Sequence, residues 1–136
     1  MDRRLCVLTL AAALAACGSS LPRPDTGPHP AAGDAYVEVA YPPPPARIEV
    51  VPSAPDAAAV WVSGEWTWQA SRWVWEPGGW IDPPPNAYLA PSATLRISDG
   101  RMLWLPNAWY DRSGKRLPKP DVRVYAQSSL AAGDGG

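Results

Sequence analysis

Apolar and polar residues alternate along much of this chain with a period of two, and no stretch repeats apolar residues at helical spacing. This alternation is typical of β-strands that bury one face. It predicts strands over 47–51 and 121–125, and a hairpin over 95–104 that turns at an Asp-Gly pair. The sequence therefore predicts an all-β domain over 47–126, built as a small antiparallel hairpin and meander.

The stretch 60–80 organises this domain, because it contains six of the eight tryptophans. A four-residue turn from Gln69 to Arg72 predicts a hairpin, and one register then places all six tryptophans opposite one another. Aromatic residues that face each other across two strands stabilise such a pair. The predicted pairs are Trp68 with Trp73, Trp66 with Trp75, and Trp61 with Trp80.

A W-x-x-G-x-W motif occurs three times, over 61–66, 75–80 and 104–109, with asparagine replacing glycine in the third copy. Glycine and asparagine both tolerate positive φ. Residues five apart on a flat strand point to opposite faces, whereas a β-bulge reverses that parity. We therefore expect a bulge or kink at the central residue of each copy, which would return both of its tryptophans to one face. The expected positions are Gly64, Gly78 and Asn107.

The motif resembles that of the bacterial WXXGXW (YXWGXW) repeat proteins of the cell envelope. The resemblance extends from about residue 47 to Trp80, with a looser copy at 104–109. It implies a small exported protein or lipoprotein with a proline-rich segment before the repeats. The family has no established activity, so the resemblance implies no catalytic role.

The first 16 residues have the features of a lipoprotein signal peptide. Arg3 and Arg4 precede a mostly apolar run over 5–16, which is too short to span a bilayer. The sequence from Leu14 to Cys17 resembles a bacterial lipobox, which implies cleavage before Cys17 and lipidation of its thiol. An ordinary signal peptide with an incidental cysteine is the alternative. Gly18, in place of a retaining aspartate, favours a lipid-anchored location on the outer membrane, facing the periplasm.

Proline is concentrated between the anchor and the domain, with ten of the 18 prolines over 18–56. Proline removes backbone donors and favours extended polyproline II. We therefore expect a disordered proline-rich tether over 17–46 that lifts the domain off the membrane. A proline run can also bind aromatic grooves, and the alternating stretch 36–41 could pair with the sheet. The small-residue tail over 127–136 is expected to be flexible.

Several kinds of chemistry lack the residues they require. Cys6 lies in the signal peptide and Cys17 would be lipidated, so the mature chain offers no disulfide or thiolate metal site. The sole histidine, His29, lies in the predicted tether, so no histidine triad or metal site is expected in the domain. We expect no cofactor and no enzyme.

Charge narrows the choice of partners. Removal of residues 1–16 leaves 10 Lys and Arg against 12 Asp and Glu, so we expect no attraction to nucleic acid. Glu65 and Glu76 flank the facing strands and could act as an acid–base pair, although exposed charges on a solvent face are more common. A basic cluster could contact anionic lipid or polysaccharide, although a solvated face is again more common. The cluster comprises Arg112, Lys115, Arg116, Lys119 and Arg123.

The tryptophans supply the remaining functional hypothesis, because a single small sheet cannot cover eight of them. Exposed indoles suit protein partners or sugar rings. The first hypothesis is a non-catalytic envelope lipoprotein with a structural or protein-interaction role. The alternative is a module that binds peptidoglycan or surface polysaccharide, with Glu65, Gln69, Arg72 and Glu76 as polar neighbours. The candidate interaction surface comprises Trp61, Trp66, Trp68, Trp73, Trp75, Trp80, Trp104 and Trp109.

Overall fold

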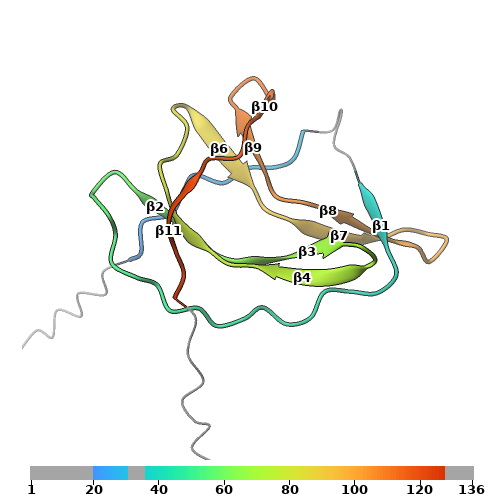
Figure 1. Cartoon of the computed structure of the whole chain (residues 1–136). Helices are drawn as coiled ribbons and strands as arrows, with labels where there is room; N and C mark the ends of the chain where they lie inside the picture. The colour runs from blue at the N-terminus through green and yellow to red at the C-terminus, as the bar shows by residue number, and fades with distance from the viewer. Residues whose placement is uncertain (1–19, 31–35, 128–136) are drawn as a thin grey trace, which may run out of the picture.

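The computed structural model describes residues 20–30 and 36–127, and within these ranges the chain is all-β, as predicted (Figure 1). The signal peptide, Cys17 and the tail over 128–136 lie outside the described residues. The strands are β1 (Val37–Val39), β2 (Val60–Val62), β3 (Glu65–Gln69), β4 (Arg72–Glu76), β5 (Gly79–Ile81), β6 (Ala87–Ala90), β7 (Ala93–Arg96), β8 (Met102–Leu105), β9 (Ala108–Asp111), β10 (Arg116–Leu117) and β11 (Val122–Tyr125).

The first half of the fold is a long hairpin whose arms are β2–β3 and β4–β5. Its register is the predicted one, and it pairs Trp61 with Trp80 and Trp66 with Trp75, as well as the two tryptophans nearest the turn. Ala70 and Ser71 form the turn, with φ values of 48° and 61°, as a two-residue hairpin loop requires. Each tryptophan pair packs edge to face, with ring centroids 5.1–5.6 Å apart.

The second half repeats this construction, with β6–β7 and β8–β9 as the arms. Leu89 pairs with Trp109 and Thr94 pairs with Trp104. These are the positions that tryptophan pairs occupy in the first hairpin, so 89–94 is a fourth copy of the motif. Leucine and threonine stand where the other copies have tryptophan, and the sequence pattern therefore revealed three copies. The fold contains two copies of one hairpin.

Both arms of both hairpins lose their strand pairing for two residues at the centre of the motif. A bulge or kink was predicted at Gly64, Gly78 and Asn107, and the structure has kinks there, without the positive φ that glycine and asparagine would tolerate. Among the described residues, the only positive-φ positions are Ala70, Ser71, Asn86, Gly100 and Gly114. The motif centres are kinks between separate strands. The kinks comprise residues 63–64, 77–78, 91–92 and 106–107.

Glycine is required at the kinks of the first hairpin because the two backbones approach closely there. A Cβ on Gly78 would lie 2.5 Å from the carbonyl oxygen of Val62 and 2.6 Å from the nitrogen of Gly64. A Cβ on Gly64 would lie 2.5 Å from the ring of Trp75. Contacts this short exclude a side chain, so space and not φ selects the residue.

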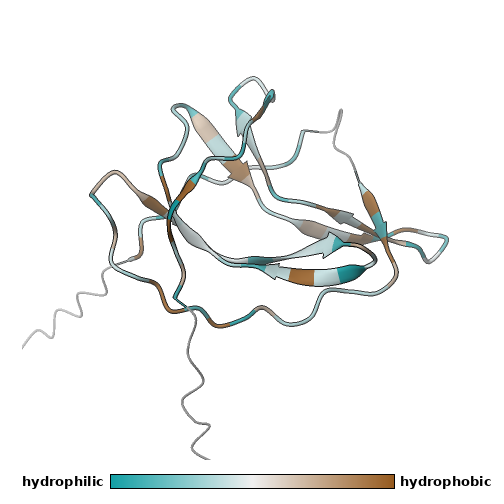
Figure 2. Cartoon of the chain, in the orientation of Figure 1, coloured by the Kyte–Doolittle hydropathy of each residue, from teal (hydrophilic) through white to brown (hydrophobic). Residues whose placement is uncertain are grey.

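The kinks also separate the tryptophans of a copy, which were predicted to share a face. Trp61 packs with Trp80 in one core cluster, whereas Trp66 packs against the cluster of Trp73 and Trp104. The third copy behaves alike, because Trp109 packs in a different cluster from Trp104. The hairpins thus supply side chains to several small cores. Much of this core is pale in Figure 2, because tryptophan is near neutral in hydropathy.

The proline-rich segment over 41–52 packs along the first hairpin, visible in Figure 1 as the strap beside β3 and β4. Three indole N–H groups donate hydrogen bonds to its backbone carbonyl oxygens. The donor and acceptor pairs are Trp73 to Tyr41 at 3.0 Å, Trp66 to Pro45 at 3.0 Å, and Trp80 to Pro52 at 2.8 Å. The guanidinium of Arg47 also lies 4.9 Å from the ring centroid of Trp66. We call residues 41–52 the strap.

The prediction of a tether over 17–46 is corrected for its described parts. The alternating stretch 36–41 does pair with the sheet, which was one of the predicted alternatives. Within it, β1 pairs with β8 and buries Val39. Segment 20–30 lies between the edges of β2 and β6: Pro22 accepts a hydrogen bond from the N–H of Trp61, and Asp25 accepts one from the N–H of Leu89. Proline lacks a donor, but its carbonyl remains a free acceptor for such edges.

Two further predictions are revised. Residues 47–51 do not form a strand, because they belong to the strap, and their pairing is limited to an isolated bridge between Val50 and Gln127. The meander is completed by distant pairings, since β11 pairs with β5 and β1 with β8. The predicted hairpin over 95–104 and the final strand are confirmed as β7–β8 and β11.

Close approach at the kink predicts that Gly78→Ala lowers the free energy of unfolding by at least about 2 kcal/mol, because overpacking must displace backbone atoms. The control is Gly100→Ala, where φ is 88° and a Cβ would have open space. That change should cost about 1 kcal/mol through backbone strain alone. Urea denaturation compares the two, and equal losses would contradict the steric explanation.

Candidate functional site

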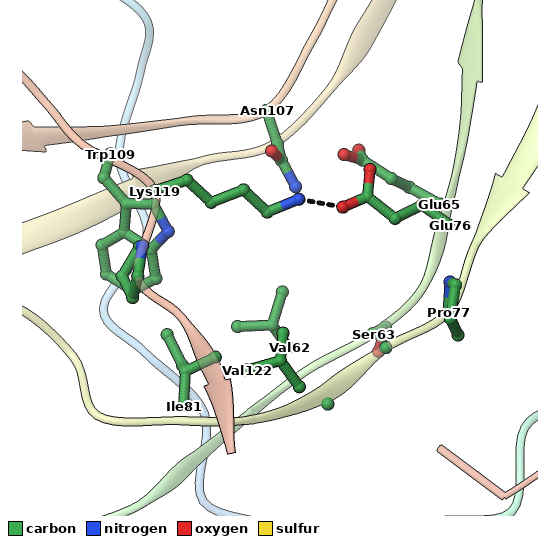
Figure 3. Close-up of a pocket in the computed structure, with 13 residues that line it drawn as sticks. Val62, Ser63, Glu65, Glu76, Pro77, Ile81, Asn107, Trp109, Lys119 and Val122 are labelled. Atoms are coloured by element: carbon green, nitrogen blue, oxygen red, sulfur yellow. Dashed lines mark hydrogen bonds and ion pairs between the residues drawn. The ribbon is translucent and has the colours of Figure 1, made fainter. Parts of the chain in front are cut away.

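The kinks of the two hairpins meet and line one cleft, shown in Figure 3. Ser63, Pro77 and Gly78 come from the first hairpin, and Asn107 comes from the second. The cleft is partly open to solvent, spans about 430 Å³ of space not filled by atoms, and has an apolar wall. That wall includes Val62, Ile81, Trp109 and Val122. The repeated motif therefore builds the cleft with its four-residue interior, between the flanking tryptophans.

Two carboxylates face this cleft, because Glu65 and Glu76 are cross-strand partners next to the kinks. The ammonium of Lys119 forms an ion pair with Glu76. In Figure 3 the side chains of Glu65, Glu76, Lys119 and Asn107 converge on one side of the cleft. Both glutamates are half-buried, so their interpretation as exposed charges on a solvent face is wrong.

Burial raises the pKa of Glu65 to about 7, from an ordinary value of 4.5. The neighbouring carboxylate of Glu76 adds to the increase, whereas a hydrogen bond with the Ser92 side chain and the charge of Lys119 oppose it. Desolvation disfavours the charged form of a carboxyl group, and a nearby like charge acts in the same direction. Glu65 therefore changes its protonation state near neutral pH.

Glu49 holds the first hairpin together at this level, although the sequence placed it in a predicted strand. The N–H groups of Gly64 and Gly78 each donate a hydrogen bond of 2.7 Å to one of its carboxylate oxygens. These donors lie on opposite arms, where the strand pairing is interrupted. The carboxylate replaces the missing pairing and connects the strap to the kinks. No motif marks this residue, because its role depends on where the strap runs.

The eight tryptophans do not form one exposed row, because none of them is fully exposed. Trp66, Trp68 and Trp75 are half-buried, and the others are buried. The prediction assumed a single sheet, whereas the duplicated hairpin and the strap cover the indoles from two sides. Of the polar neighbours proposed with them, Gln69 and Arg72 pair at the exposed tip of the first hairpin.

Several residues of the predicted basic cluster form ion pairs with separate segments of the chain. Arg112 pairs with Asp25 at 2.9 Å. Arg123 bridges Asp56 and Asp82 at 2.6 Å and 2.9 Å. Lys119 forms a further ion pair in the cleft. These ion pairs connect segments that are far apart in the sequence. The solvated-face interpretation is incomplete, because three of the five residues have carboxylate partners.

His29, a possible metal-binding site and a possible membrane-spanning helix were also considered among the described residues. His29 packs in the fold, with one ring nitrogen 2.7 Å from the carbonyl oxygen of Pro91 and the other 3.4 Å from the hydroxyl of Tyr110. No group of three or more metal-binding side chains occurs within 20–30 and 36–127. In the same ranges, no helix has the length and apolar character needed to cross a membrane.

Comparisons of the chain with protein-family models, with curated proteins and with solved structures found no match. The resemblance to the WXXGXW repeat proteins therefore stays a prediction from the motif residues.

The raised pKa of Glu65 predicts a pH-dependent stability. Between pH 4.5 and 7 the folded state binds more protons than the unfolded state, so the free energy of unfolding falls as pH rises. From pH 5 to pH 7 the contribution of this group should fall by at most about 3 kcal/mol. Glu65→Gln should remove this part of the slope, measured by urea denaturation at both pH values. Glu38→Gln, at an exposed position, should leave the slope unchanged; equal slopes in all three proteins would refute the assignment.

The contacts of Glu49 predict that Glu49→Gln destabilises the domain. The amide can accept one of the two hydrogen bonds and loses the charge, which should cost about 1–3 kcal/mol. Urea denaturation at pH 7 measures the loss, with Glu38→Gln again as the control. Hydrogen exchange gives a local readout, because the amides of Gly64 and Gly78 should exchange faster in the variant. Unchanged exchange at both amides would show that the carboxylate does not hold them.

Proposed function

We propose that this protein is a non-catalytic lipoprotein of the bacterial envelope, anchored through lipidated Cys17 on the outer membrane and facing the periplasm. Its β-domain has a structural or protein-interaction role. The proposal rests on the lipobox-like sequence before Cys17 and on the start of the packed chain. Among the described residues, Leu21 packs with Trp61 and Trp80, Pro22 bonds to β2, and Asp25 bonds to β6. A mature chain that begins at Cys17 would keep all of these contacts.

The same observation supports a position close to the membrane. Leu21 packs with Trp61 and Trp80, and it follows the predicted anchor at Cys17 by four residue steps, with three residues between them. An extended chain covers at most about 3.6 Å per residue, so this link reaches on the order of 15 Å. The domain would then lie against the membrane surface, without the long spacer that the proline content suggested.

A protein-interaction role is supported by the outer side of the strap. Ile48 is 94% exposed there, and Val50 and Val51 are also exposed. A large aliphatic side chain in water gains free energy when a partner covers it. The glycan alternative, in the form predicted from the sequence, required an exposed row of indoles. Because the tryptophans are covered, that form of the alternative lacks its binding platform.

The anchor yields a direct test, in which the membrane fraction of expressing cells is analysed by intact mass. We expect a mature chain that begins at Cys17 and carries lipid on its thiol and amino terminus. Cys17→Ser should abolish the lipid mass and move the protein to the soluble fraction, whereas Cys6→Ser, inside the removed segment, should change neither. A soluble wild-type protein with unmodified Cys17 would contradict the proposed function.

A further inference from the structure

Three cavities meet at Glu65. The first is the cleft of Figure 3; the second lies beside segment 23–26, and the third lies beneath residues 43–46 of the chain. The second and third have empty volumes of about 600 Å³ and 630 Å³ and share Gly64, Glu65 and Ser92 in their walls. The second and third cavities adjoin at these three residues, and we call the two together the kink groove.

The kink groove lies in the seam between the two hairpins. Its walls come from the end of β2 and the start of β3 on one side, and from the kink at 91–92 and the start of β7 on the other. Segment 22–27 fills the adjoining part of this seam, where it bonds to Trp61 and Leu89. Between β3 and β7 the structure records no strand pairing among the described residues. The seam is thus filled at one end and hollow at the other.

The walls combine indole surface with hydrogen-bond acceptors. Trp66 and Trp75 are half-buried and meet edge to face, with centroids 5.2 Å apart. The carboxyl of Glu65 and the hydroxyl of Ser92 hydrogen-bond to each other, and with the amide of Asn107 they supply acceptors and donors. The nearby cations are engaged, because Arg23 donates to Ser63, Lys119 pairs with Glu76, and Arg47 lies over one face of Trp66. A matching ligand would exchange hydrogen bonds with these groups and present an apolar face to the indole surface that stays open.

Sugar rings have both properties, since their hydroxyl groups donate hydrogen bonds and their C–H faces pack on aromatic rings. Anionic ligands are disfavoured, because the carboxylate of Glu65 would repel them when it is charged. An added peptide strand is also disfavoured at this point. It needs a continuous row of backbone groups, whereas both edges are interrupted by the kinks, and Pro91 has no N–H to donate.

We propose that the kink groove binds a neutral saccharide chain, with Glu65 accepting hydrogen bonds from its hydroxyl or acetamido groups and Trp66 and Trp75 contacting its ring faces. The inference rests on the proposed envelope location, because it names a class of ligand for that domain. It places glycan binding at the junction of the two hairpins. The exposed tips of the hairpins and the outer side of the strap do not take part.

The test titrates the protein as purified from expressing cells, in detergent, with two neutral oligosaccharides, a β-1,4-linked tetramer of N-acetylglucosamine and one of glucose. Calorimetry and tryptophan fluorescence report binding at millimolar ligand, the range expected for a short oligosaccharide. We expect saturable binding of at least one tetramer. Glu65→Gln should weaken it by at least about tenfold, the equivalent of 1.4 kcal/mol.

Two further variants guard against a loss of fold. Thr94→Lys adds a long side chain at an exposed position of the groove wall, and it should obstruct binding while urea denaturation stays close to wild type. Gln69→Ala, at the hairpin tip, should bind like wild type. A folded protein that binds neither tetramer would overturn the inference, as would binding that both groove variants leave unchanged. Capture of an extended peptide instead of the sugars would also overturn it. None of these outcomes depends on lipidation, so the anchor is judged separately by intact mass.

Discussion

The fold depends on a match between a side chain that only donates hydrogen bonds and a backbone that mostly accepts them. Indole carries one N–H donor and no acceptor, whereas a proline-rich segment has few N–H groups and a full set of carbonyl oxygens. Three indoles bond to the strap in this way, and no buried side-chain polar atom of the described residues lacks a partner. A chain without phenylalanine, and without cysteine in its described residues, can therefore bury large rings and leave no buried indole N–H unsatisfied.

The kinks have a second, related constraint. Two arms can cross closely at Gly64 and Gly78 because neither has a side chain, and the N–H groups that lose their strand partners there are capped by Glu49. The second hairpin has Ser92 and Asn107 at the equivalent points, so it leaves polar side chains in the space that glycine leaves empty. The first hairpin thus has a close backbone approach at its kinks, whereas the second has polar side chains there, and residues of both line the cavities.

The sequence pattern predicted those features of the fold that depend on residues close together in the chain. The all-β class and the register of the tryptophan hairpin follow from alternation and from the turn at Ala70 and Ser71. The fourth copy of the motif was not recognised in the sequence, because it has Leu89 and Thr94 where the other copies have tryptophan. The strap and the role of Glu49 were not predicted, because proline content indicates how stiff a segment is but not which part of the protein it packs against. The pKa of Glu65 likewise depends on burial between two hairpins, which no local pattern contains.

The placement of segment 20–30 sets an order of events during biogenesis. Its carbonyl groups bond to residues of β2 and β6, which leave the ribosome later than the segment itself. The segment therefore cannot dock until the chain has been synthesised at least as far as β6, and contacts between such distant parts of a chain form late in folding. Under the proposed function, cleavage and lipid transfer at Cys17 would therefore act on a chain whose first described segment has not yet docked.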